Sequence, residues 1–260
     1  GIPGEKKNGV YHGVLMLRDI ALGRIPNLAG KSVVVVGAGD TAMDAARSAL
    51  RLGAKEVNLV YRRDREQVPA QDAEFHATEE EGVGMHLLSN PVLVLGDRTV
   101  TGVRLQRQQL GDFDSSGRRR PVAIPGSEFD MPCDMLVPAI GQVTWVDDES
   151  VDMHRKDSFS VGKAFELDVL GVFAAGDAVT GPATVVQAVA HGNQVALVVD
   201  AWLKTGELGG VYYRPVRHDI PQLFNLQNYA DARRPPEKML TPEERISRQD
   251  FCEVQMGLGE

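Results

Sequence analysis

Hydrophobic residues along the chain fall into short uninterrupted runs and longer segments with helical spacing. Residues 32–36 are one serine followed by four valines, which is typical of a parallel strand buried on both faces. Apolar residues then recur at helical spacing between Asp40 and Leu52, and Gly53 indicates where that helix ends. The next apolar run covers residues 57–61. This order of elements predicts a βαβ unit.

Beyond this unit, the pattern predicts smaller elements and one hairpin. The expected elements are an acidic helix over residues 70–81 and strands over residues 85–88, 92–95 and 134–141. Residues 99–108 alternate between apolar and polar side chains, and a polar turn follows over residues 111–117. The sequence therefore predicts an antiparallel β excursion within an otherwise parallel α/β domain.

The rest of the chain predicts a second strand–turn–helix junction and a tail. A short hydrophobic strand leads into Gly176 and Asp177, and a helix rich in valine and alanine is expected from about residue 183 to 203. From there the chain becomes polar and contains several prolines, which is typical of an extended segment. The expected segments are a connector over 1–30, an α/β domain over 31–141, part of a second domain over 142–206 and a tail over 207–260.

The composition is that of a soluble globular protein, with 43% hydrophobic and 25% charged residues among 260. A formal net charge of −8 argues against nucleic-acid binding, which requires a basic face. Cys133 and Cys252 lie far apart and fit neither a redox-active CxxC pair nor a metal site. Because the sequence contains no long apolar span and no signal-peptide pattern, we expect a cytoplasmic protein without a membrane span.

A glycine-rich turn joins the valine-rich strand to the helix after it. Residues 37–42 read Gly-Ala-Gly-Asp-Thr-Ala, and a GxGxxA pattern between a strand and a helix is the setting that dinucleotide binding requires. Gly37 permits the tight turn, Gly39 lets a pyrophosphate approach the main chain, and Ala42 permits close packing. The helix then offers unpaired N–H groups and its positive dipole end to the phosphates. A glycine turn without a ligand is the alternative.

The end of the following strand indicates which nicotinamide dinucleotide to expect. NAD enzymes usually place an acidic residue there to bind the ribose hydroxyls, whereas this chain has Arg62 and Arg63. Guanidinium groups bind a 2′-phosphate in a bidentate manner, so the pair favours NADP(H) over NAD(H). Alternatively, the two arginines are solvated surface charges or pair with Asp64 and Glu66.

Two roles stay open for Asp40 and Thr41 in the first helical turn. Their side-chain oxygens can cap backbone N–H groups or contact the ligand. Among the histidines, His76, His86 and His191 have no nucleophile or carboxylate at a spacing that indicates catalysis, so we expect them on the surface or in the core.

The junction at residues 176–177 is similar in spacing to that of flavoprotein reductases. In those proteins the aspartate holds the ribityl and phosphate side of FAD, and the next helix points its N-terminus at the flavin ring. The resemblance carries this role over to Gly176, Asp177, Thr184, Val185 and Val186. A helix dipole there would stabilise negative charge on reduced flavin. An aspartate in an ordinary strand-to-helix turn is the alternative.

Residues 31–206 resemble the reductase part of the glutamate synthase small (β) subunit family, which includes portions of dihydropyrimidine dehydrogenase and of NADP-linked ferredoxin reductases. The matching strings lie at residues 35–44, 61–64, 68–70, 81–83, 139–142 and 176–188. The resemblance also makes Ile140 and Gly141, in the string Ala-Ile-Gly-Gln, expected cofactor contacts. It implies an α/β fold in which a Rossmann-like, three-layer NADP(H)-binding domain is followed by the C-terminal part of an FAD-binding domain.

The resemblance also implies that the chain is a portion of a larger reductase. Residues 2–5, Ile-Pro-Gly-Glu, match the point where such chains cross from the FAD domain, and residues 251–254 match their C-terminal tail. A complete flavin site in this family needs a further glycine-rich turn upstream, and iron–sulfur clusters bind to a cysteine-rich N-terminal segment. The sequence contains neither, so residues 1–30 are expected to be the connector from the FAD domain.

The reaction implied by the resemblance is hydride transfer from NADPH to FAD. Electrons would then leave through iron–sulfur clusters to an iron–sulfur domain or a large catalytic subunit. This step needs positioning more than acid–base chemistry, so no catalytic residue is expected in the chain. The alternative is a dinucleotide-binding regulatory or structural module without redox turnover. A short-chain dehydrogenase is disfavoured because no tyrosine has a lysine four positions later.

Overall fold

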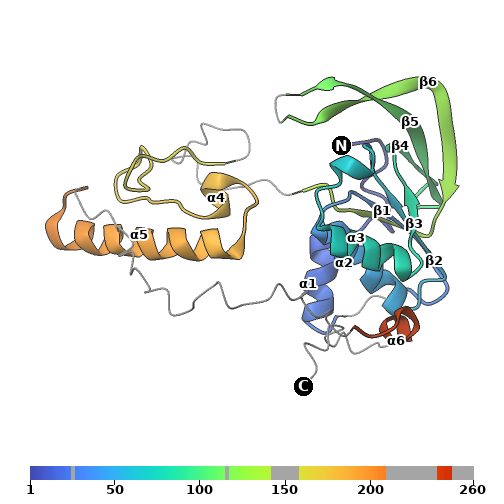
Figure 1. The fold of residues 1–260 in the computed structure, drawn as a ribbon, viewed down its shortest axis with the longest axis horizontal. Helices are drawn as coiled ribbons and strands as arrows, with labels where there is room; N and C mark the ends of the chain where they lie inside the picture. Colours follow the sequence, from blue (N-terminus) through green and yellow to red (C-terminus); the bar gives the residue numbers. More distant parts are fainter. Residues whose placement is uncertain (25–26, 115–116, 142–157, 209–238, 248–260) are drawn as a thin grey trace, which may run out of the picture. The chain divides into compact units, whose positions relative to one another are not determined.

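The computed structural model describes residues 1–24, 27–114, 117–141, 158–208 and 239–247. The chain divides into two compact units (Figure 1). Unit 1 comprises Gly1–Gly141 and Arg233–Glu260, and unit 2 comprises Gln142–Ala232. The division after Gly141 coincides with the boundary expected from the sequence, whereas part of the expected tail belongs to unit 1.

A parallel sheet of four strands forms the centre of unit 1, in the order β3-β2-β1-β7. These strands are β1 (Ser32–Val36), β2 (Glu56–Val60), β3 (Gly84–His86) and β7 (Met135–Pro138). β1 pairs in parallel with β2 on one side and with β7 on the other. All four strands therefore end at the same edge of the sheet, the carboxyl edge, where ligands bind in folds of this kind.

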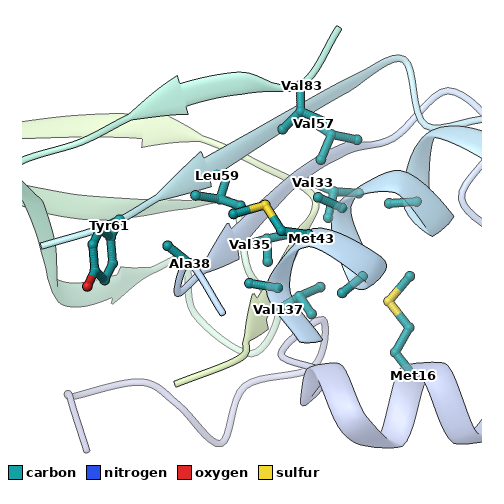
Figure 2. Packing of buried hydrophobic residues seen from close by; sticks show 14 of the residues in the cluster. Met16, Val33, Val35, Ala38, Met43, Val57, Leu59, Tyr61, Val83 and Val137 are labelled. Carbon is teal, nitrogen blue, oxygen red and sulfur yellow. The ribbon is translucent and has the colours of Figure 1, made fainter. Parts of the chain in front are cut away.

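The uninterrupted valines of β1 are explained by two separate hydrophobic cores. Val33 and Val35 belong to one core, and Val34 and Val36 belong to the other. This division follows from the strand period of two residues, which sends alternate side chains to opposite faces. Figure 2 shows the first core, in which Val33 and Val35 lie close to Met43 of the covering helix. Both faces of the sheet are therefore covered.

Three helices lie on the side of the first core. They are α1 (Gly13–Ala21), α2 (Asp40–Arg51) and α3 (Asp72–Glu80), and a short 3-10 helix, η1 (Arg65–Gln67), precedes α3. Residues 1–30, which were expected to be a connector, also contribute to this core, because Met16 of α1 and Leu28 are completely buried in it. The N-terminal segment therefore stabilises the dinucleotide unit in addition to leading into it.

An antiparallel sheet covers the other face with β4 (Ser89–Leu95), β5 (Gly102–Phe113) and β6 (Arg119–Pro132). Val94, Val103 and Leu105 of this sheet belong to the second core. The expected excursion is present, and β5 extends five residues past the strand end expected at residue 108. Helices, parallel sheet and antiparallel sheet form the three layers expected for this fold class, which is confirmed.

The tail contains a helix, α6 (Pro242–Ser247), which the sequence analysis treated as extended. The sequence signal is a capping box: Glu244 N–H donates to Thr241 Oγ1 at 3.3 Å, and Thr241 N–H donates to Glu244 Oε2 at 2.9 Å. Pro242 suits the first helical position because its missing N–H would be unpaired there. The buried Arg245 side chain then attaches this segment to α3 through Glu80 and Glu81.

Buried charges connect α2, α3 and α6. Glu81, whose side chain is 0% exposed, accepts hydrogen bonds from Arg47 Nε at 3.0 Å and Nη2 at 2.8 Å. Arg51 and Arg245 approach the same carboxylate at 3.6 and 3.7 Å. A buried carboxylate needs such partners because the interior solvates it poorly. Glu81 is therefore the centre of a charge cluster in the helical layer.

Unit 2 contains the two described helices α4 (Asp177–Thr180) and α5 (Val185–Thr205). Phe173 packs edge-to-face against Trp202 of α5, with ring centroids 5.7 Å apart. The assignment of residues 142–206 to an FAD domain stays a prediction, and residues 142–157 lie outside the described part of the chain.

Replacement of Glu81 by alanine should destabilise the protein strongly. The substitution leaves Arg47 buried without its main partner, so we expect a loss of about 3–5 kcal/mol in the free energy of unfolding. Glu80→Ala is the matched control, because Glu80 is 57% exposed and should cost less than about 1 kcal/mol. Chemical denaturation measures the free energy of unfolding of both variants. Equal losses of this free energy would contradict the central role of Glu81.

Candidate dinucleotide and flavin sites

The turn between β1 and α2 requires glycine at its first position. Gly37 has a φ of +129°, and a Cβ atom there would lie 2.3 Å from the carbonyl oxygen of Ala139. Gly37 N–H also donates to Val60 O at 2.9 Å, and Ala139 N–H donates to Val36 O at 2.7 Å. The turn is therefore packed tightly between the ends of β2 and β7, which excludes any side chain at this position.

The N-terminus of α2 presents backbone donors without protein acceptors. Gly39 precedes the helix and has no side chain to cap it, and its Cβ position is open apart from Pro69 at 4.0 Å. Among the described residues, the N–H groups of Asp40 and Thr41 have no acceptor. Unpaired N–H groups and the positive end of the helix dipole are what a pyrophosphate binds. The residues at this turn therefore fit a dinucleotide.

The side chain of Asp40 acts on a neighbouring helix. Its Oδ1 accepts a hydrogen bond from Gln71 N–H, the residue before α3, at 3.3 Å. This hydrogen bond joins the start of α2 to the residue before α3, and both roles expected for Asp40 stay predictions. Thr41 is half-buried, and Ala42 is completely buried against the sheet. Small size at Ala42 lets α2 approach β1 closely.

The loop after β2 forms a wall beside the glycine turn, which sequence reasoning did not find. Ala70 N–H donates to Ala38 O at 3.2 Å, and Tyr61 OH donates to Gln67 O at 2.8 Å. Asp64 Oδ1 and Gln67 Oε1 are buried acceptors with no donor among the described residues. The sequence signal for this loop was the string Val-Pro-Ala at residues 68–70. It matches the related family, and its position beside the glycine turn now gives a physical reason for the match.

The structure separates the two arginines after β2. Arg62 is exposed and has no ion pair among the described residues. Arg63 is 3% exposed: its Nη2 donates to Asp114 Oδ2 at 2.8 Å and its Nε donates to Arg119 O at 2.9 Å. Of the pair expected to bind a 2′-phosphate, only Arg62 is therefore exposed in this structure. Binding of the 2′-phosphate by either residue stays a prediction.

Ile140 and Gly141 follow β7 at the same carboxyl edge. Ile140 is 73% exposed, and Gly141 has a φ of +105° with nothing near its Cβ position. The fold thus brings the turn at residues 37–42, Arg62 and Ile140 together at one edge of the parallel sheet.

In unit 2, Gly176 is held by a histidine that sequence reasoning set aside. Gly176 N–H donates to Nδ1 of His191 at 3.2 Å, and His191 packs against Phe165. Gly176 has a φ of +62°, and its Cβ position lies 3.8 Å from Ala188 of α5. The hydrogen bond fixes the turn on α5, and no regular spacing in the sequence indicates this pairing. Asp177 is exposed at the start of α4.

The start of α5 is capped by its own side chains. Gln187 N–H donates to Thr184 Oγ1, and Thr184 N–H donates to Gln187 Oε1, forming a capping box. Val185 and Val186 are 79% and 77% exposed. Their N–H groups have no acceptor among the described residues, so the helix N-terminus can face a ligand. Thr184 thus caps the helix, and its expected contact with the flavin stays a prediction.

Cys133 is a buried free thiol in the second core. Burial, together with the smaller effect of the nearby Asp134, raises the pKa of the thiol to about 12. The group is therefore protonated at neutral pH and is a poor nucleophile. Cys252 lies outside the described residues. The described residues contain no group of histidine, cysteine and acidic side chains that could hold a metal ion.

Alanine substitutions at the two glycines of the turn should differ in their effect on the stability of the protein. Gly37→Ala strains a positive φ and clashes with Ala139 O, so we expect a loss of at least about 1–3 kcal/mol in stability. Gly39→Ala meets open space at a φ of −85° and should change stability by less than about 1 kcal/mol. Thermal unfolding compares the stability of the two variants. Equal destabilisation would contradict the tight packing of the turn at Gly37.

Known proteins with similar sequences include three named as NADP-dependent enzymes or subunits. The chain is 46% identical over 212 residues to the NADP(+)-dependent formate dehydrogenase subunit beta of Moorella thermoacetica, covering 79% of this chain and 30% of that protein. It is 39% identical over 239 residues to the NADPH-Fe(3+) oxidoreductase subunit beta of Geobacter sulfurreducens, covering 80% and 35%. The glutamate synthase [NADPH] small chain of Azospirillum brasilense is 40% identical over 184 residues, covering 68% and 38%.

Solved structures show the same fold at lower identity. Mycobacterium tuberculosis FprA in complex with NADPH matches with a TM-score of 0.61 at 19% identity, covering 78% of this chain and 60% of that one. Thioredoxin reductase of T. acidophilum matches with a TM-score of 0.59 at 21% identity, covering 78% and 62%. None of the described helices combines the length and apolar character that crossing a bilayer requires.

The chain spans about a third of the length of these curated relatives. Residues 1–192 match the family described as pyridine nucleotide-disulphide oxidoreductase. Together with the glycine turn at the carboxyl edge of the sheet, these matches confirm the expected resemblance to the glutamate synthase small subunit and its relatives. The chain belongs to the pyridine nucleotide-disulphide oxidoreductase family.

Proposed function

We propose that this chain is the NADP(H)-binding part of a flavin-dependent oxidoreductase. The observation that carries the proposal is the open N-terminus of α2, where Asp40 and Thr41 present unpaired N–H groups behind a glycine-only turn. That arrangement accommodates the pyrophosphate of a dinucleotide. The names of the relatives, which mention NADP(+) or NADPH, support the same cofactor.

Arg62 is the residue we propose for recognition of the 2′-phosphate. It is exposed at the carboxyl edge of the sheet, two residues after β2, where NAD enzymes place an acidic side chain. A guanidinium forms strong charge-assisted hydrogen bonds with the 2′-phosphate, and its hydrogen bond to an uncharged ribose hydroxyl is weaker. NADP(H) should therefore bind more tightly than NAD(H).

The second unit supplies the residues proposed for the flavin. When bound, NADPH would supply a hydride and FAD would accept it, and iron–sulfur clusters would carry the electrons onward to a partner subunit. Asp177 would hold the ribityl and phosphate side of FAD, and the N-terminus of α5 at Val185 would stabilise negative charge. His191 keeps the turn in place through Gly176. No side chain in this scheme gives or takes a proton, since the chain contributes binding and orientation.

Titration with NADPH and NADH tests the nucleotide assignment. Arg62→Ala should weaken NADPH binding by about 1–3 kcal/mol and leave NADH binding unchanged, because only the 2′-phosphate loses a charge-assisted contact. Lys55→Ala is the matched control, since Lys55 is exposed at the opposite end of the same strand. Equal losses for the two cofactors would refute the role of Arg62. Absence of binding by the unaltered protein would refute the proposed function.

Hydride transfer needs a separate measurement. Addition of NADPH to the larger reductase, of which this chain is proposed to be a portion, should bleach the yellow absorbance of its bound FAD, because reduced flavin absorbs little visible light. If the larger reductase bound NADPH but carried no flavin, this chain would instead be part of a dinucleotide-binding module without redox turnover.

A further inference from the structure

The hairpin formed by β5 and β6 continues past the carboxyl edge of the parallel sheet. Residues Gly102 to Arg107 of β5 pair with β4, whereas the rest of β5 pairs only with β6. β4 starts at this edge, because Ser89 N–H donates to Tyr61 O directly after β2. The six residues from Gln108 to Phe113 therefore extend roughly 20 Å beyond the paired region. Figure 1 shows β5 and β6 continuing past β4.

Arg63 fastens the end of this hairpin to the end of β2. We call residues 110–114 and 117–121 the hairpin tip. Arg63 Nη2 donates to Asp114 on one side of the tip, and Nε donates to Arg119 O on the other. The Arg63 side chain thus bridges the end of β2 and the hairpin tip, so the tip lies close to the neighbouring Arg62. A buried guanidinium without these partners would be costly. The two hydrogen bonds therefore fix the position of the tip relative to the end of β2.

The tip presents an aromatic ring and positive charge. Phe113 and Arg119 are directly opposite each other in the antiparallel pairing, so their side chains share one face. Phe113 is 72% exposed. Arg119 Nε donates to Gly111 O at 3.2 Å, and its Nη groups have no acceptor among the described residues. The charged side chains at the tip and beside it are Arg62, Asp112, Asp114, Arg118, Arg119 and Arg120, and Arg63 pairs with Asp114.

We propose that the hairpin tip is the outer wall of the adenosine end of the dinucleotide site, with Arg119 as a second ligand of the 2′-phosphate. This inference deepens the proposed function and rests on it. Arg119 can place its free Nη groups on the phosphate that Arg62 approaches from the sheet, and Phe113 offers a flat apolar surface for the adenine. Arg63 is a positioning residue that acts through the tip.

The arrangement also explains why two successive arginines follow β2 and differ in burial. A single exposed arginine would leave the 2′-phosphate open to solvent on its far side. A second arginine turned inward toward Asp114 and Arg119 O brings a third cation to that side. Charge-assisted contacts from two directions would hold the 2′-phosphate more strongly than a contact from one direction.

Binding of 2′,5′-ADP, which carries the 2′-phosphate and adenosine without nicotinamide, tests the proposal. Arg119→Ala should weaken its binding about tenfold in isothermal titration calorimetry and leave 5′-AMP binding unchanged. The matched control is Arg98→Ala, which removes an exposed arginine from the loop at the other end of the same antiparallel sheet. Unchanged 2′,5′-ADP affinity in Arg119→Ala, while the unaltered protein binds NADPH, would overturn the proposal and leave the proposed function standing.

Arg63→Lys tests the positioning role. Lysine keeps the charge but cannot donate to Asp114 and Arg119 O together from one planar group. We expect faster amide hydrogen exchange at residues 110–114 and 117–121 and weaker 2′,5′-ADP binding, with 5′-AMP binding unchanged. A variant that loses affinity for both nucleotides equally, or keeps its affinity for 2′,5′-ADP while the tip exchanges faster, would refute this role. Failure of the unaltered protein to bind any of these nucleotides would instead refute the proposed function.

Discussion

The structure of unit 1 depends on burial of one parallel sheet on both of its faces. β1 carries four valines because helices cover one face and the antiparallel sheet covers the other. With both faces covered, the carboxyl edge is where the main chain can meet a ligand. The glycine turn, the exposed Arg62 and Ile140 all lie at that edge because the strands that precede them are parallel.

The same layering decides how charge is distributed. Glu81 is buried among arginines of α2 and α6, and Arg63 is buried against the hairpin tip. In both places a charged group inside the unit connects segments that lie far apart in the sequence. Such contacts cost desolvation and are retained where they fix one geometry. In this chain one attaches α6, and the other places a hairpin beside the carboxyl edge of the parallel sheet.

Local signals predicted elements better than their partners. The helical spacing over residues 40–52 and the GxGxxA pattern gave α2 and its turn nearly to the residue. The capping box at Thr241 was equally local, and α6 was missed because the surrounding prolines were given more weight. Burial of Met16 and Leu28 depends on contacts with distant strands, so the interpretation of residues 1–30 as a connector understated their role.

The sequence by itself determined the βαβ unit, the glycine turn and the family, because strand and helix periods and backbone freedom are written in neighbouring residues. Only the tertiary structure decided which arginine stays available. Arg62 and Arg63 are adjacent and chemically identical, yet one is exposed and the other is buried between Asp114 and Arg119. Their difference arises from a hairpin some fifty residues away, since a buried guanidinium takes its partners from whatever the fold brings beside it.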